Sequence, residues 1–145
     1  MNVVDSSGWI EYFLDSPRAD LFADAIEASQ LLVVPVISIY EVYKFLVKQT
    51  TEAIAGQCIE VMQRGRVIDF TPNRAIAAAK MAHLHQLAMA DAAIYSIALE
   101  HKATLWTQDA DYQNLPQVQY FSKGLRLKDK RKTRQGFLSK SIASP

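Results

Sequence analysis

Carboxylates stand at four places in this sequence where a charge is unusual for its surroundings. Asp5 follows the apolar pair Val3-Val4 at the start of the chain. Glu41 and Asp91 each lie in a long apolar stretch, and Asp109 follows a run of residues typical of a strand. Hard divalent cations such as Mg²⁺ and Mn²⁺ prefer oxygen ligands, and clustered carboxylates repel one another unless a cation lies between them. If the fold brings these acids together, they predict a metal site suited to phosphodiester hydrolysis.

Glu41 has the strongest physical argument of the four. The helix expected over residues 38–48 is apolar nearly all round, so we expect it to be largely buried. A buried glutamate must be paired or bound to a metal, because a lone buried charge is very costly. The alternative to a metal is an ion pair with Lys44, Lys48 or an arginine elsewhere.

For the aspartates, a local structural role is the alternative. Aspartate often caps a helix or forms an Asx-turn. Asp5 and Asp91 stand where helices are expected to begin, and Asp109 and Asp111 stand just after a strand. Ser6, or the serine after it, is a substitute cap that would leave the Asp5 carboxylate free. A capping carboxylate also keeps one oxygen for a ligand, so both roles are compatible, and Asp111 competes with Asp109 for the fourth position.

Other catalytic chemistries lack their motifs. The sequence contains neither Gly-x-x-x-x-Gly-Lys nor Gly-x-Gly-x-x-Gly, and no Gly-x-Ser-x-Gly nucleophile elbow. Phosphoaspartate hydrolases need a second aspartate two positions after the first, where this chain has Ser7. His83 and His85 are two positions apart and would point away from each other on a helix, which argues against a zinc pair.

Strands and helices are expected to alternate along the first 121 residues, from short β-branched runs and from apolar residues at helical spacing. We expect strands at 3–4, 31–34, 66–70, 103–107 and 118–121, and helices at about 9–14, 17–26, 38–48, 50–64, 72–85 and 92–101. The alternation predicts parallel crossovers, hence an α/β sheet covered on both faces. Ligands bind such sheets beyond the carboxyl ends of the strands, where Asp5 and Asp109 stand.

Length and charge predict one domain followed by a basic tail. The chain has 145 residues, and its single cysteine, Cys58, suits a reducing cytoplasm. We expect neither a signal peptide nor a membrane span. Residues 1–121 hold eight basic and fourteen acidic residues, whereas residues 122–145 hold eight basic residues and one acid. The tail either supplies phosphate contacts or is solvated and accessory, and we favour the accessory role because charge runs are usually solvated.

Four short segments carry the acids together with their neighbours. They are Val3-Val4-Asp5-Ser6-Ser7, Ser38-Ile39-Tyr40-Glu41-Val42, Met89-Ala90-Asp91-Ala92-Ala93-Ile94 and Leu105-Trp106-Thr107-Gln108-Asp109-Ala110-Asp111-Tyr112. Each segment alone is unspecific. In their order and spacing, across about residues 1–121, they resemble the PIN domain, and in particular the VapC-type toxins of bacterial toxin–antitoxin pairs.

The resemblance implies a three-layer fold, with a central parallel sheet of four to five strands flanked by helices, and Mg²⁺- or Mn²⁺-dependent hydrolysis of RNA. The residues that it assigns to catalysis and metal binding are Asp5, Glu41, Asp91 and Asp109, with Asp111 as a fifth acid that holds a second metal or supports the first. Ser6 and Thr107 match hydroxyl positions that orient the carboxylates. The resemblance also implies a homodimer and a cognate antitoxin that blocks the site.

Two features depart from the family pattern, and two other functions remain open. Tyr112 stands where phenylalanine is more usual, and the basic tail is not part of the pattern. The first alternative is a PIN-type nuclease that acts in RNA maturation or on DNA flaps. The second is a non-catalytic PIN module that binds RNA. The short core favours the toxin, because it leaves little room for extra substrate domains.

Overall fold

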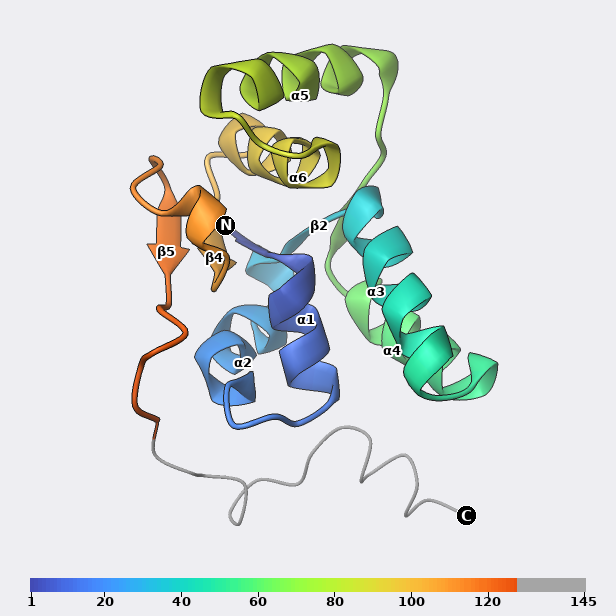
Figure 1. Ribbon diagram of the computed structural model, residues 1–145. Coiled ribbons are helices and arrows are strands. Elements are labelled where there is room, and N and C mark those ends of the chain that lie inside the picture. Colours follow the sequence, from blue (N-terminus) through green and yellow to red (C-terminus); the bar gives the residue numbers. More distant parts are fainter. Residues whose placement is uncertain (128–145) are drawn as a thin grey trace.

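The computed structural model describes residues 1–127, in which strands and helices alternate along the chain (Figure 1). The strands are β1 (Asn2–Val4), β2 (Val33–Pro35), β3 (Arg66–Ile68), β4 (Thr104–Thr107) and β5 (Val118–Tyr120). The α-helices are α1 (Ser6–Phe13), α2 (Ala19–Glu27), α3 (Val36–Gln49), α4 (Glu52–Met62), α5 (Pro72–His85) and α6 (Met89–Glu100). Two short 3-10 helices, η1 (Ser29–Leu31) and η2 (Ala110–Tyr112), complete the described part.

All strand pairs within the described residues are parallel. One sheet has the order β1-β4-β5, and β2 pairs with β3. A single parallel bridge between Asn2 and Leu32 joins the two, so the strands follow the order β3-β2-β1-β4-β5. Because the strands are parallel, their carboxyl ends share one edge. The predicted α/β fold is confirmed.

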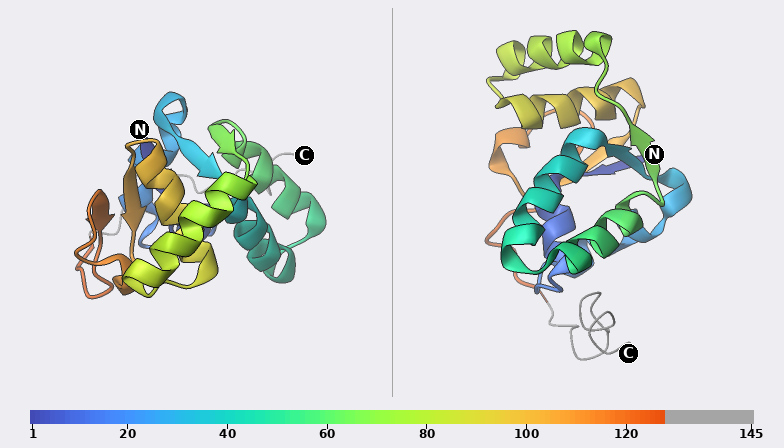
Figure 2. Two further views of the ribbon diagram at one scale, coloured as in Figure 1. Left: turned by 90° about the horizontal axis from the view of Figure 1, so that it is seen from above. Right: turned by 90° about the vertical axis from the view of Figure 1, so that its right-hand side faces the viewer.

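Two hydrophobic cores cover opposite faces of the strands, because successive side chains of a strand alternate between its faces. Val4 and Val34 pack in a core with residues of α1, α2, α3 and α4. Their neighbours Val3 and Val33 pack in a second core, mainly with α6. The views in Figure 2 show the helices on the two sides of the strands. The arrangement is the predicted three-layer architecture.

Local sequence signals set where several helices begin and how closely they pack. The Thr71 side chain accepts from the Arg74 backbone N–H, and Pro72 opens α5 with a φ angle that suits a first helical turn. Gly8 lies in α1, where a Cβ would come within 2.8 Å of both the Phe22 ring and Val4. Glycine therefore lets α1 lie directly against β1 and α2.

The expectation that the helix around Glu41 is largely buried is wrong. In α3 only Ser38, Val42 and Leu46 are buried, whereas the Tyr40 side chain is 64% exposed. The reason is its position: α3 packs on α1, α4 and α6 along one side and leaves its aromatic side to solvent. Its apolar residues are therefore divided between the core and the surface.

Most of the predicted basic tail, residues 128–145, lies outside the described residues. Among residues 1–127, no helix combines the length and the apolar character that crossing a membrane requires.

Candidate metal centre

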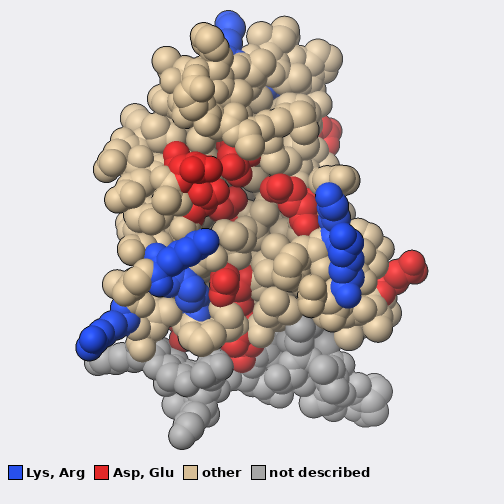
Figure 3. Space-filling model, in the orientation of Figure 1, with Lys and Arg blue, Asp and Glu red and all other residues tan. Residues whose placement is uncertain are grey.

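An acidic cleft lies where the carboxyl ends of β1 and β4 meet α3 and the first turn of α6. It has a volume of about 300 Å³. Its lining residues are Asp5, Ser6, Ser7, Glu41, Asp91, Gln108, Asp109 and Lys123. Figure 3 shows acidic side chains gathered on this face, with basic side chains beside them. The structure thus brings together the four acids singled out from the sequence, although 104 positions separate Asp5 from Asp109.

Asp5 is held on both of its carboxylate oxygens. Oδ1 accepts from the Ser6 backbone N–H at 2.7 Å, so Asp5 itself caps α1. Oδ2 accepts from the hydroxyls of Ser7 at 3.1 Å and of Thr107 at 3.0 Å. The interpretation that a serine caps α1 in place of Asp5 is therefore wrong. With only 4% of its surface exposed, this carboxylate has almost no freedom to reorient.

Thr107 connects the ends of two strands. Its hydroxyl donates to Asp5 and accepts from the Asp109 backbone N–H at 2.9 Å. Asp109 in turn accepts from the Asp111 backbone N–H at 2.9 Å and caps η2, which is the predicted Asx-turn. The fully buried Thr107 hydroxyl therefore couples the position of Asp5 to that of Asp109.

Glu41 is held by a hydroxyl and not by a basic residue. The Ser6 hydroxyl donates to Glu41 Oε1 at 2.7 Å. The ion pairs found between described residues all involve Glu100, with Arg74 and His101 as its partners. The alternative interpretation, in which Lys44 or Lys48 neutralises Glu41, therefore has no support in this part of the chain.

Asp91 is the third residue of α6, behind Ala88 at the capping position, and makes no capping hydrogen bond. The Tyr112 hydroxyl donates to the Asp91 backbone carbonyl at 3.0 Å and so fixes the start of α6 against η2. One carboxylate oxygen from each of Asp91, Asp109 and Asp111 lies within 4.8 Å of the others. Asp91 and Asp109 are half-buried, and Asp111 is exposed.

Burial and mutual repulsion raise the pKa values of two acids in the cleft, Asp5 and Asp91. Burial, together with the charges of Asp91 and Asp109, raises the pKa of Asp5 to about 7, although its hydroxyl donors oppose the shift. Burial and the neighbouring Asp109 raise the pKa of Asp91 to about 6. Such shifts mean that the positive charge near Asp5 and Asp91 does not balance the negative charge of the neighbouring acids, so the cluster has a deficit of positive charge. An all-oxygen donor set with this deficit fits a hard divalent cation.

Two residues of the site region, Arg18 and Lys123, had no signal in the sequence. Arg18 donates from Nε to Gln108 Oε1, and Gln108 Nε2 donates to Glu11 at 3.3 Å. Lys123 comes from the segment after β5. These residues are brought together only by the packing of α1, α2 and the end of the sheet, so spacing along the chain could not identify them.

The PIN domain family model matches residues 3–118, and the chain therefore belongs to the PIN domain family. The resemblance predicted from four short segments is confirmed at the level of the family.

Solved structures with this fold include toxin–antitoxin proteins. A toxin–antitoxin complex from Klebsiella pneumoniae has a chain with 19% identity and a TM-score of 0.71, over 82% of this chain and 96% of that one. VapC20 from Mycobacterium tuberculosis, described as a sarcin-ricin loop cleaving toxin, has 15% identity and a TM-score of 0.66, over 80% and 95%. FitAcB from Neisseria gonorrhoeae has 19% identity and a TM-score of 0.61, over 84% and 97%. Among curated protein sequences, none matches. At these identities the likeness establishes the fold.

Proposed function

We propose that this protein is a metal-dependent endoribonuclease and the toxin of a VapBC-type toxin–antitoxin pair. The observation that carries the proposal is the convergence of Asp5, Glu41, Asp91 and Asp109 on one cleft, from four separate elements. Family membership supports the proposal, as does the description of VapC20, a protein of the same fold, as a sarcin-ricin loop cleaving toxin.

The residues that would hold Mg²⁺, or Mn²⁺, are Asp5, Glu41, Asp91 and Asp109, with Asp111 beside them. Once bound, the ion would lower the pKa of an attacking water and neutralise charge on the phosphodiester. The three carboxylates of Asp91, Asp109 and Asp111 lie close enough together to share an ion, and Asp5 repels both Asp91 and Asp109. This set supports the proposed site without deciding between one ion and two.

The chain's hydroxyls hold the carboxylates in place. Ser6 orients Glu41, and Thr107 orients Asp5 while also fixing the Asp109 backbone. Such outer contacts keep metal-binding oxygens from rotating away from a shared point. Among the described residues, no cysteine or histidine lines the cleft, and the hydroxyls of Ser6 and Ser7 donate to Glu41 and Asp5, so water is the proposed nucleophile.

The proposal includes partners and a cellular setting. A cognate antitoxin that blocks the site is supported by the toxin–antitoxin complex from Klebsiella pneumoniae, which shares the fold. The homodimer and the cytoplasmic location are proposed from the family resemblance. We also propose that residues 1–121 form the nuclease domain and residues 122–145 a basic extension, because the family match ends at residue 118.

The test is cleavage of a total RNA pool by the full chain, with the cut sites mapped. We expect cuts in the presence of Mg²⁺, none in the presence of EDTA, and restored cleavage when Mg²⁺ is added in excess. RNA cleavage by the Asp5→Asn variant is expected to fall to the level that the wild type shows with EDTA. Asp24→Asn, an exposed acid of α2, is the matched control and should cleave like the wild type. Cleavage that survives EDTA, or an active Asp5→Asn variant, would overturn the proposal, and selective cutting of DNA flaps would favour the other PIN-type activity.

A further inference from the structure

The segment that follows β5, residues 121–127, is fixed to the body of the protein at its start. We call it the C-terminal strap. The Phe121 backbone N–H donates to the Thr107 carbonyl at 2.9 Å, and the Phe121 ring packs against Phe22 and Trp106 at centroid distances of 5.6 and 6.0 Å. The strap therefore leaves β5 in a defined direction.

Arg18 fixes the strap a second time. Its guanidinium donates to the carbonyls of Phe121 at 3.2 Å and Ser122 at 3.1 Å. The same side chain binds Gln108, which lines the acidic cleft. One residue at the start of α2 thus ties the strap to the rim of the candidate site.

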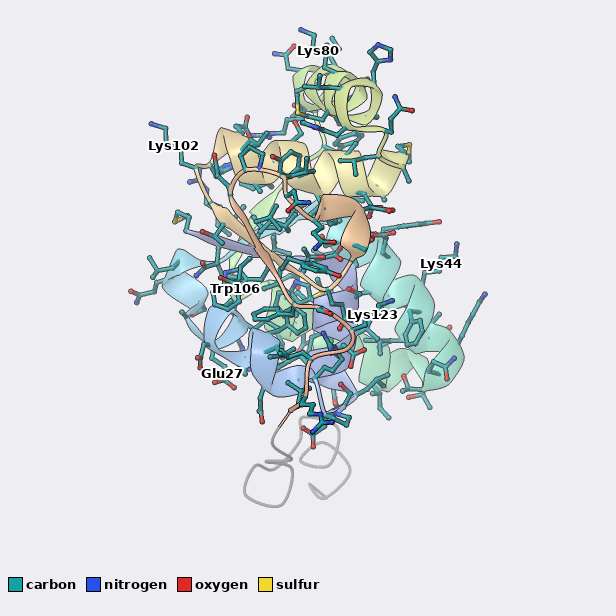
Figure 4. All side chains as sticks on the ribbon, turned by 60° about the vertical axis from the view of Figure 1, so that its left-hand side comes forward. Glu27, Lys44, Lys80, Lys102, Trp106 and Lys123 are labelled. Carbon is teal, nitrogen blue, oxygen red and sulfur yellow. The ribbon has the colours of Figure 1, made fainter. Side chains whose placement is uncertain are left out.

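These anchors bring Lys123 to the cleft. Of the lining residues that the structure describes, Lys123 is the one basic residue. Figure 4 shows Lys123 well away from Lys80, which lies on the outer side of α5. The Lys123 side chain is exposed, and within residues 1–127 no carboxylate lies within 4.0 Å of its ammonium group. Lys123 therefore does not neutralise the acids directly and is available for an outside anion.

We propose that Lys123 binds a backbone phosphate of the RNA next to the bond that is cut, and that Arg18 is a positioning residue that holds Lys123 there. This inference rests on the proposed function. An acidic cleft repels a polyanion, and a cation at its rim attracts a phosphate while leaving the carboxylates free for metal. Part of the basic extension thus has a substrate-binding role instead of the accessory role favoured from the sequence.

The experiment measures kcat and KM of the full chain on a fluorescein-labelled single-stranded RNA that contains one mapped cut site. Lys123→Ala should raise KM about fivefold, the effect of about 1 kcal/mol of lost binding, with kcat changed less than twofold. Lys123→Arg should restore KM. Lys80→Ala removes one equally exposed charge far from the cleft and should leave KM unchanged.

Salt dependence separates a phosphate contact from a structural effect. The slope of log KM against log salt should become shallower by about 0.7 in Lys123→Ala, as expected for one lost contact to single-stranded RNA. Arg18→Met should raise KM to a similar extent. The KM of the double variant should be no higher than that of the single variant with the higher KM, because both substitutions remove the same contact.

Binding of the same RNA to Asp5→Asn proteins tests the inference apart from cleavage. Lys123→Ala in that background should weaken binding about fivefold, and Lys80→Ala should not. Equal effects of the two alanine variants, or a fall in kcat with KM unchanged, would overturn the inference and leave the proposed function standing. A wild-type protein that never cuts the RNA but loses affinity for it in Lys123→Ala would overturn the proposed function and keep the phosphate contact of Lys123, and one that neither binds nor cuts the RNA would overturn both.

Discussion

The two sides of the acidic cleft are built differently. On one side, Asp5 is 4% exposed and accepts three hydrogen bonds, one of them from the buried Thr107. On the other side, Asp109 and Asp111 belong to a short turn at the surface, and Asp111 is exposed. On the buried side three protein donors fix the carboxylate, whereas on the exposed side the Asp109 carboxylate accepts, among the described residues, only from the Asp111 backbone N–H of its own turn. Substitutions on the two sides should therefore differ in how far they lower RNA cleavage and in whether they also lower stability.

Thr107→Val should have the larger effect, because it removes the hydroxyl that donates to Asp5 and accepts from the Asp109 backbone N–H, while keeping the shape of the side chain. We expect RNA cleavage to fall by about 10- to 100-fold, the usual cost of losing a residue that orients metal ligands. The variant should also lose about 1–3 kcal/mol of unfolding free energy, since a buried polar group is left unsatisfied.

Kinetics and urea unfolding measure these two effects. Thr104→Val is the matched control in the same strand, because no hydrogen bond of the Thr104 hydroxyl is found. If Thr107→Val cleaves RNA at the control rate, the comparison between the two sides fails.

The buried side should also make the metal-free protein less stable as the pH rises. The pKa of Asp5 is about 7 in the folded protein against 3.8 for an ordinary aspartate, so the folded state holds a proton that the unfolded state releases earlier. The stabilisation that Asp5 contributes to the folded protein is fully present below pH 4 and is lost as the pH rises toward 7. We expect Tm in EDTA to fall by about 4 °C or more between pH 5 and pH 8.

The Asp5→Asn substitution should reduce the change of Tm between pH 5 and pH 8, and the control substitution Asp24→Asn should not. Added Mg²⁺ should raise Tm at pH 8, because a ligand that binds only the folded state stabilises it. A metal-free Tm that rises from pH 5 to pH 8 would contradict the raised pKa of Asp5.

The smallest effect should come from Asp111→Asn on the exposed side. Asp111 is exposed, and an asparagine side chain keeps one of the two carboxylate oxygens. We expect cleavage to fall less than 10-fold, with a rise in the Mg²⁺ concentration needed for half-maximal activity as the main change. Titration of activity with Mg²⁺ measures it, with Asp109→Asn as the comparison. A complete loss in Asp111→Asn but not in Asp109→Asn would assign the fourth ligand to Asp111.

Sequence reasoning predicted the elements and the acids because both depend on local patterns. The strands begin and end near their expected residues, although β3 ends at Ile68 and not at Phe70. The structure places Glu41 beside the other acids of the cleft, although the burial argument for it was wrong, since α3 is exposed on its aromatic side. The roles of Arg18 and Lys123 could not be predicted, because contacts between residues about 100 positions apart have no local pattern.

The capping geometry of the acids has an electrostatic consequence. Asp5 caps α1, Asp91 lies in the first turn of α6 and Asp109 caps η2. The start of an α-helix carries about half a positive charge from its aligned peptide dipoles, which favours a nearby carboxylate by about 0.3–1 kcal/mol. The starts of α1 and α6 thus act as a partial, permanent counterion for Asp5 and Asp91. For Asp5, capping α1 and lying close to the other acids of the cleft are therefore compatible, because the start of the helix offsets part of its charge.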